Sequence, residues 1–277
     1  MNIYIKILKM NFLIQTFIKD LKIVLSYKLQ FIFSLFSIVI TLFTFYLISS
    51  LVGEGANNHL DQYENDYFKF LFLGIITAEI TLIISTFPNK NIRNMQLTGV
   101  FEQLLASGRN EYLIILSTFL YPMFWLIFKI FIYFLAGFIF FDINIAYFNI
   151  SYIEFLSLIF FIIGIVGVGC LSISATIFFK SSDFVSALYL SLSALLGGVA
   201  YPLSVLPESL RILSNLLPTT HFLEIIRINS YSNNFGNGNL NHLIMLIILS
   251  LTFFILGMLA LKISLMLSKK NGSLLYY

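Results

Sequence analysis

Two charged residues, Glu79 and Lys129, interrupt long apolar stretches of the sequence. An ionised side chain at the middle of a membrane costs about 2.5–3.5 kcal/mol on insertion scales unless it is paired or hydrated. Counted along two antiparallel helices, Glu79 and Lys129 lie at similar depth, so they could form an ion pair between neighbouring helices. The alternatives are that Lys129 extends its ammonium group to the membrane surface and that Glu79 faces a cavity. Residues of this kind would also suit an ion-coupled carrier or a channel.

The sequence contains no motif of a nucleotide-hydrolysing or metal-dependent enzyme. It has no Gly-x-x-x-x-Gly-Lys-Ser/Thr loop, no His-Glu-x-x-His pair, no Cys-x-x-Cys and no Gly-x-Ser-x-Gly turn. Its three histidines, His59, His221 and His242, are too scattered in the sequence to propose a metal site. We therefore expect no catalytic site, cofactor or metal in this chain, and any energy for work must come from another chain or from an ion gradient.

The composition is that of a membrane protein. Of the 277 residues, 59% are hydrophobic and 10% are charged, against about 45–50% and about 25% in soluble domains. The mean hydropathy is +0.93. The net charge of +3 is small and dispersed, so we expect no nucleic-acid partner.

Six apolar stretches are long enough to be membrane helices, because about 20 apolar residues span a hydrocarbon core of roughly 30 Å. None shows the alternation of a barrel strand. We predict an all-α protein with one transmembrane domain over residues 1–277 and membrane helices over 29–52, 67–87, 112–141, 155–179, 184–201 and 243–261.

The basic residues indicate the orientation, since Lys and Arg are retained on the cytoplasmic side. Most of the 16 Lys and Arg lie in the N-terminal segment, in the connections between helices two and three and between helices four and five, and at the C-terminal end. We therefore expect a multi-pass protein of the cytoplasmic membrane with both termini in the cytoplasm.

Residues 8–28 read as an amphipathic helix that precedes the first membrane helix. Leu13, Phe17 and Leu21 share its apolar face, and Phe12 and Ile23 are exceptions to the pattern. We expect this helix to lie in the cytoplasmic interface, with its lysines near anionic lipid or its polar face against a soluble partner.

The connection between helices two and three is patterned over residues 98–108. Gly99 can cap a short helix, and Glu102 lies favourably near the positive end of its dipole. Phe101, Leu104 and Leu105 share one apolar face, spaced as the anchors of a helix that binds a groove on a soluble protein. The alternative is a surface helix that lies in the interface.

The segment between helices five and six is apolar but too short to cross the membrane. Pro207 can begin a short helix, and Pro218 interrupts the pattern before a second helix, which we expect to begin after Thr219 or Thr220. We predict that residues 203–227 form two short re-entrant helices at the outer side.

These features together resemble the permease subunits of type-2 ATP-binding-cassette (ABC) exporters. In that family an interfacial helix precedes six membrane helices, a Gly-Thr-x-Glu-x-Leu-type coupling segment follows helix two, and a Gly-x-x-x-Pro-x-x-x-x-Pro stretch leads into re-entrant helices. Val100 stands here where Thr is usual, and Gly108 where Pro often follows. The resemblance implies a coupling site made of Gly99, Phe101, Glu102, Leu104, Leu105 and Ser107, and an outer gate made of Gly198, Tyr201, Pro202, Pro207, Pro218 and Arg227.

The resemblance also implies partners. Two separate ATPase subunits would bind ATP and Mg²⁺ and push the coupling segment, while a second permease, identical or homologous, would enclose a path with this one in a bacterial cytoplasmic membrane. The apolar, aromatic-rich chain suits an amphipathic or hydrophobic cargo such as a drug, a lipid or a lipid-linked glycan. The rival hypotheses are an ion-coupled carrier or channel that uses Glu79 and Lys129, and a membrane scaffold without transport.

Overall fold

The computed structural model describes residues 2–57, 66–141, 143, 151–180, 183–231 and 237–270. In these ranges the chain is helical and contains no strand, which confirms the all-α prediction. The helices are α1 (Asn2–Ser26), α2 (Lys28–Asn57), α3 (Tyr67–Leu97), α4 (Val100–Ala106), α5 (Glu111–Phe141), α6 (Tyr152–Phe179), α7 (Phe184–Leu196), the short 3-10 helix η3 (Leu203–Val205), α8 (Glu208–Ser214), α9 (Pro218–Tyr231) and α10 (Asn237–Lys270).

Five of the described helices are long and apolar enough to cross a membrane, namely α2, α3, α5, α6 and α10. The predicted helix over 184–201 is corrected: α7 ends at Leu196 after 13 residues, a length of about 20 Å at 1.5 Å per residue. Gly197 caps α7 with its N–H on the Ser193 carbonyl, and Gly198 has a φ of +71°, in the left-handed region that glycine favours. The chain therefore turns away five residues early.

Helix α3 is longer than its predicted range of 67–87, because Pro88 lies inside it rather than ending it. Asn89, directly after the proline, is fully buried and held by two neighbours. Its side-chain amide donates to Asp183 Oδ1 at 3.0 Å, and Thr176 Oγ1 donates to its carbonyl oxygen. These contacts with the end of α6 and the start of α7 fix the α3 backbone where proline removes a helical hydrogen bond.

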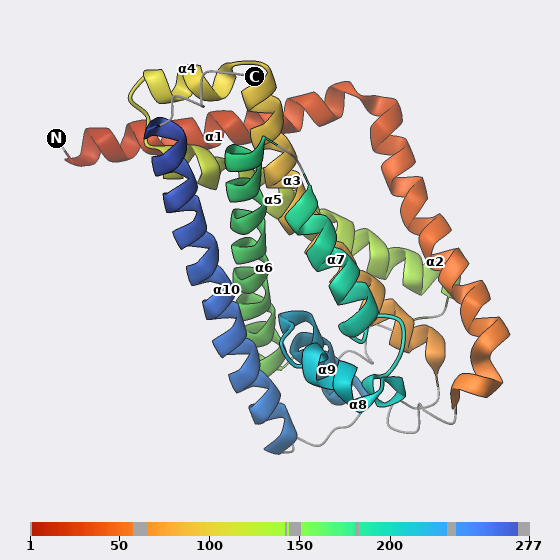
Figure 1. Cartoon of the computed structure of the whole chain (residues 1–277). Coiled ribbons are helices and arrows are strands. Elements are labelled where there is room, and N and C mark those ends of the chain that lie inside the picture. Colours follow the sequence, from red (N-terminus) through yellow and green to blue (C-terminus); the bar gives the residue numbers. More distant parts are fainter. Residues whose placement is uncertain are drawn as a thin grey trace.

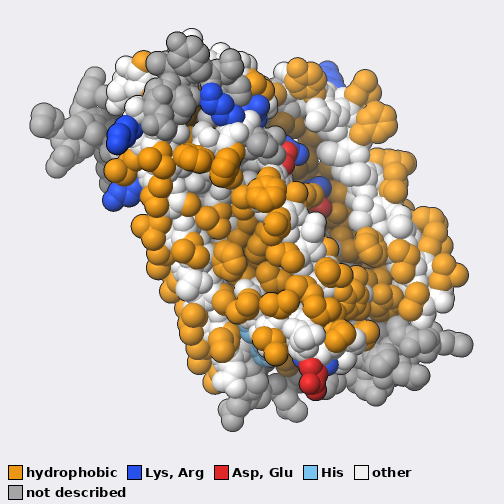
Figure 2. Space-filling model, viewed as in Figure 1, with side chains coloured by type: hydrophobic (Ala, Val, Ile, Leu, Met, Phe, Trp, Pro, Cys, Tyr) orange, Lys and Arg blue, Asp and Glu red, His pale blue; other side chains and the backbone are white. Residues whose placement is uncertain are grey.

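The helices divide between two ends of the molecule, as the predicted topology requires. Helix α1 lies across one end of the bundle, where α4 and the last turn of α10 also lie, whereas α8 and α9 lie at the opposite end (Figure 1). Hydrophobic side chains cover the long helices, and Lys and Arg gather at the α1 end (Figure 2). The surface between the two ends is therefore suited to a bilayer.

Helices α6 and α10 pack so closely that glycine is required at their contact. A Cβ atom on Gly167 would lie 2.5 Å from the Phe253 carbonyl oxygen, and one on Gly257 would lie 2.3 Å from the Gly167 carbonyl oxygen. Ser174 Oγ donates to the Ala260 carbonyl at 2.8 Å, and Ser264 Oγ donates to the Ser174 carbonyl at 2.9 Å. Close packing of this kind stabilises helix pairs in membranes, where apolar burial contributes little.

We predict that Gly167→Leu destabilises the protein, because the backbone of α10 blocks the new side chain and the helices must separate. Overpacking typically costs about 1–3 kcal/mol, so the melting temperature of the purified protein in detergent should fall by several degrees. Thr252→Leu adds similar bulk to an exposed position of α10 and should leave that temperature unchanged. Equal melting of the two variants would contradict the role of the glycine.

Candidate functional site

Two glycines with left-handed backbone conformations define the coupling segment. Gly99 precedes α4 with a φ of +70°, and Gly108 follows it with a φ of +75°. A Cβ atom on either glycine would meet nothing within 4 Å, so the backbone conformation, and not crowding, calls for glycine here. These two turns set α4 at an angle to α3 and α5.

The apolar face of α4 packs against this chain, whereas the sequence pattern led us to expect this face in a groove of a soluble protein. Phe101 is fully buried in the core, and Leu104 and Leu105 pack partly against the same core. Gln103 and Ser107 are exposed, as is 39% of Val100, while Glu102 is half-buried. A soluble partner would therefore contact the polar face of α4, and Phe101 would anchor α4 to the bundle.

Three contacts connect the helices around α4. The Arg109 guanidinium lies 4.4 Å from the ring centroid of Phe12 in α1, and Asn91 of α3 donates to the Asp20 carboxylate of α1 at 3.2 Å. Lys269, near the end of α10, forms an ion pair with Glu111 at the start of α5. These contacts tie α1 to α3 and to the residue stretch after α4, and they tie α5 to α10.

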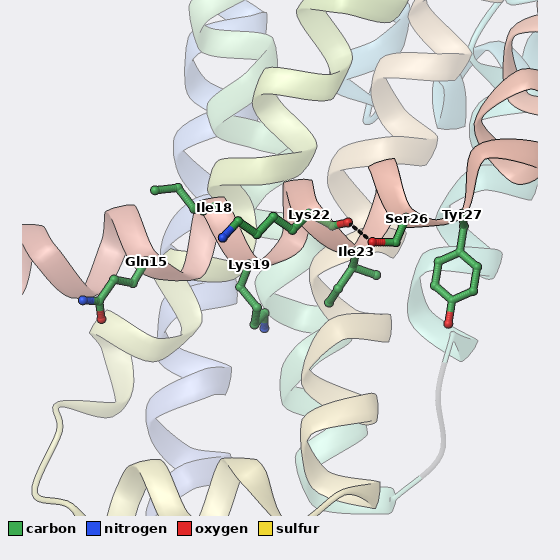
Figure 3. Close-up of a pocket in the computed structure, with 7 residues that line it drawn as sticks. All are labelled: Gln15, Ile18, Lys19, Lys22, Ile23, Ser26 and Tyr27. Carbon is green, nitrogen blue, oxygen red and sulfur yellow. Dashed lines mark hydrogen bonds between the residues drawn. The ribbon is translucent and has the colours of Figure 1, made fainter.

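Helix α1 differs in detail from the amphipathic pattern. Within residues 11–26 of α1, Phe12, an exception to that pattern, is the buried apolar residue. Ile14 and Leu25, which the pattern places on the apolar face, are exposed. A shallow groove follows the exposed side of α1 and includes Lys19, Lys22 and Tyr27 (Figure 3). The Ser26 hydroxyl donates to the Lys22 carbonyl at 2.7 Å beside it.

At the opposite end, prolines and an aromatic residue shape the connection from α7 to α9. Pro202 precedes η3, and Pro207 precedes α8, in agreement with the prediction that a short helix begins at Pro207. The second helix, α9, begins at Pro218 itself and not after Thr219 or Thr220, because proline is well tolerated in the first turn of a helix. Tyr201 donates its hydroxyl to the Leu195 carbonyl and so turns back onto α7.

Arg227 of α9 holds this connection against α3. Its guanidinium donates to the carbonyls of Gly198 at 2.6 Å, Phe70 at 3.0 Å and Val199 at 3.2 Å, and its Cζ lies 3.4 Å from the Phe70 ring centroid. The side chain is fully buried. The structure thus brings together Gly198 and Arg227, which are distant in the sequence, because the carbonyls left unpaired after α7 need a donor that water cannot supply here.

A histidine pair at the same end was not foreseen from the sequence. His221 Nδ1 lies 3.1 Å from His242 Nδ1, and His221 Nε2 lies 3.0 Å from the Asn215 carbonyl oxygen. Since a carbonyl only accepts, Nε2 of His221 donates and its Nδ1 accepts from His242. Burial lowers the pKa of His221 below its ordinary value; the hydrogen bond to the Asn215 carbonyl raises the pKa in part, and the charge of His242 lowers it. Neutral His221 therefore joins α8, α9 and α10.

Glu79 and Lys129 form the ion pair that the sequence suggested. Lys129 of α5 donates to Glu79 Oε1 of α3, and each side chain is 14% exposed. Lys129 therefore does not extend to the membrane surface, which was one of the alternatives. The pair joins two membrane helices at a depth where an unpaired charge would be costly.

The sequence profile of the ABC-2 type transporter membrane domain matches residues 14–231, from α1 to α9. The chain belongs to the ABC-2 type transporter family. It is therefore a permease of an ABC transporter and a multi-pass membrane protein. No curated protein matches the sequence.

For this permease, we predict that Arg227→Met destabilises the α7–α9 connection. Three carbonyls would lose the same donor, and each unpaired buried group costs about 1–3 kcal/mol. Arg211→Met is the matched control: Arg211 also donates to backbone carbonyls, those of Ser204 and Leu206, but it is exposed, so its loss should cost below about 1 kcal/mol. Thermal unfolding would compare the two variants, and a similar loss in both would contradict the buried contact.

We also predict that Glu79→Lys and Lys129→Glu each lower the yield of folded permease, because each places two like charges together inside the bilayer. The double variant should restore yield and melting temperature, since it rebuilds the pair in the opposite sense. Size-exclusion chromatography and thermal unfolding would measure this. Failure of the double variant to recover would count against a stabilising pair.

Proposed function

We propose that this permease is the membrane subunit of an ATP-driven exporter. Two permeases would enclose the path, and two ATPase subunits would bind ATP and Mg²⁺ beneath α4 and α1. The observation that supports the proposal best is the construction of α4, with Phe101 fixed in the core and a polar face left exposed beside α1. Such a helix can receive a push and pass it to the bundle without changing its own shape.

The proposed motion needs no chemistry in this chain. Closure of the ATPase pair would displace α4, and the contacts of Phe12, Asp20 and Glu111 would carry the displacement to the long helices. At the other end, α7 and the segment held by Arg227 would open or close the exit. Gly198, Tyr201 and Pro202 make that segment a short turn and not a continued helix.

The surfaces of α2 and α7 suit the second permease. In α2 only 11% of the apolar span is buried, and α7 exposes Phe184, Leu188 and Leu195. The exposed apolar faces of these helices have no neighbours among the described residues. An interface between two permeases must exclude lipid from the path, and these faces could form it. An amphipathic or hydrophobic cargo would suit walls of this composition.

The carrier hypothesis has less support. Glu79 is already neutralised by Lys129, so it does not offer a free carboxylate to a transported cation.

We expect Gln103→Arg to weaken binding of the cognate ATPase, because Gln103 lies on the exposed face of α4. A hot-spot loss of about 1.4 kcal/mol would lower co-purification about tenfold, with no change in the melting temperature of the permease. By contrast, Phe101→Ala should lower that temperature, since it empties a core position. ATPase pull-down and thermal unfolding give the two readouts.

Glu208→Arg is the control, because Glu208 is an exposed polar residue of α8 at the opposite end. It should retain the ATPase fully. If Gln103→Arg kept both the ATPase and its stimulation, α4 would not be the coupling surface and the exporter proposal would lose its mechanism.

A further inference from the structure

A cavity of about 280 Å³ lies between α1, α2, α3 and α5, around the inner side of the Glu79–Lys129 pair. Its lining includes Lys90 of α3, Phe31 of α2, and Tyr121 and Trp125 of α5. Figure 2 shows positive and negative side chains within the hollow that separates α2 from the rest of the bundle. The cavity thus combines charged and apolar walls at the side of the molecule.

A second cavity of about 280 Å³ adjoins the first toward α1. The two share Val24, Phe87, Lys90 and Tyr121 in their walls. From Glu79 in the first to Asn94 in the second, the lining follows α3 for 15 residues, or about 22 Å at 1.5 Å per residue. This length matches a molecule with a headgroup and an extended chain better than it matches an ion.

One wall of the cavity is aromatic. Tyr121 and Trp125 stack at 12° with ring centroids 6.4 Å apart, Phe31 lies 5.6 Å from Trp125, and Phe87 lies 5.9 Å from Tyr121. Aromatic rings offer large apolar contact area with little loss of side-chain freedom. This wall can hold a hydrocarbon chain next to polar residues.

The charges of the cavity favour an anion. The lining contains two lysines, Lys90 and Lys129, and one acidic residue, Glu79. Each ammonium group has three N–H donors, and Lys129 donates one of them to Glu79. Asp20, in the adjoining cavity, is already bound by Lys19 at 3.1 Å and by Asn91. Lys90 lies 11 residues from Glu79 on α3, or about 16 Å at 1.5 Å per residue, so one small headgroup does not reach both lysines. A phosphate or carboxylate would therefore bind Lys90, while Lys129 stays paired with Glu79 deeper in the cavity.

We propose that this cavity is a binding site for an anionic amphiphile, with its headgroup at Lys90 and its chain along Trp125 and Phe31. The bound molecule is either a lipid of the bilayer or a cargo of the transporter. Only the second role rests on the proposed function, because binding itself needs no ATPase.

Trp125 is the single tryptophan of the chain, so its fluorescence reports on this cavity alone. The full-length permease would be placed in phosphatidylcholine nanodiscs and titrated with ω-bromoundecyl phosphate or with the neutral ω-bromoundecanol, since bromine quenches tryptophan on contact. Concentrations are counted as the compound bound to the membrane, so that partitioning does not enter the comparison. On this scale the phosphate should reach half-maximal quenching at a concentration about tenfold lower than that of the alcohol, as one hydrogen bond to a charged group allows.

Lys90→Gln should reduce this preference, and it leaves folding intact because Lys90 is exposed. Lys22→Gln is the matched control, an exposed lysine on α1 that lines neither cavity. A relocated reporter, Trp125→Phe with Phe131→Trp on the exposed side of α5, should be quenched equally by both compounds.

Equal quenching of Trp125 by the phosphate and the alcohol, or an unchanged preference in Lys90→Gln, would overturn the proposal. Addition of phosphatidylglycerol to the nanodiscs separates the two sources of ligand. Competition with the bromoundecyl phosphate would assign the site to a bilayer lipid, whereas a preference that persists would assign it to a cargo. If this preference is found but the ATPase pull-down of the preceding subsection fails, the site is supported and the exporter proposal is contradicted.

Discussion

Polar groups inside a membrane must find partners within the protein, and in this permease several of those partners meet at α3. Along its length, the Phe70 carbonyl accepts from Arg227 of α9, Glu79 pairs with Lys129 of α5, Asn89 bonds to Thr176 and Asp183, and Asn91 bonds to Asp20 of α1. Since no water replaces these contacts in hydrocarbon, each one fixes a neighbouring helix to α3. Helix α3 therefore links the two ends of the molecule.

The packing of the other helices follows a different principle. Helices α6 and α10 approach through Gly167 and Gly257 and exchange serine hydrogen bonds, which makes them a rigid pair. In contrast, only 11% of the apolar span of α2 is buried, whereas α7 exposes one side and buries Tyr189 and Leu196 on the other. The molecule thus combines a firmly held part with one helix, α2, that is largely exposed.

In the proposed mechanism, force enters the permease at the junction between α3 and α4. Gly99 turns the chain directly after the last turn of α3, and the buried ring of Phe101 then holds α4 to the core. Force applied to the polar face of α4 would therefore reach α3 and, through the contacts described above, both the charged cavity and the segment held by Arg227.

The sequence alone determined the class of fold, the order of the segments and the family, because hydropathy, charge bias and proline and glycine positions act locally. It also suggested the Glu79–Lys129 pair, because an ion pair offsets the cost of two opposite charges that lie at equal depth in a membrane. Tertiary structure alone decided that Phe101 faces inward, that α7 ends at Leu196, that α3 continues past Pro88 and that His221 meets His242. An amphipathic pattern shows that a face is buried but not against what, and distant partners such as Thr176 and Asp183 for Asn89 become neighbours only when the helices pack.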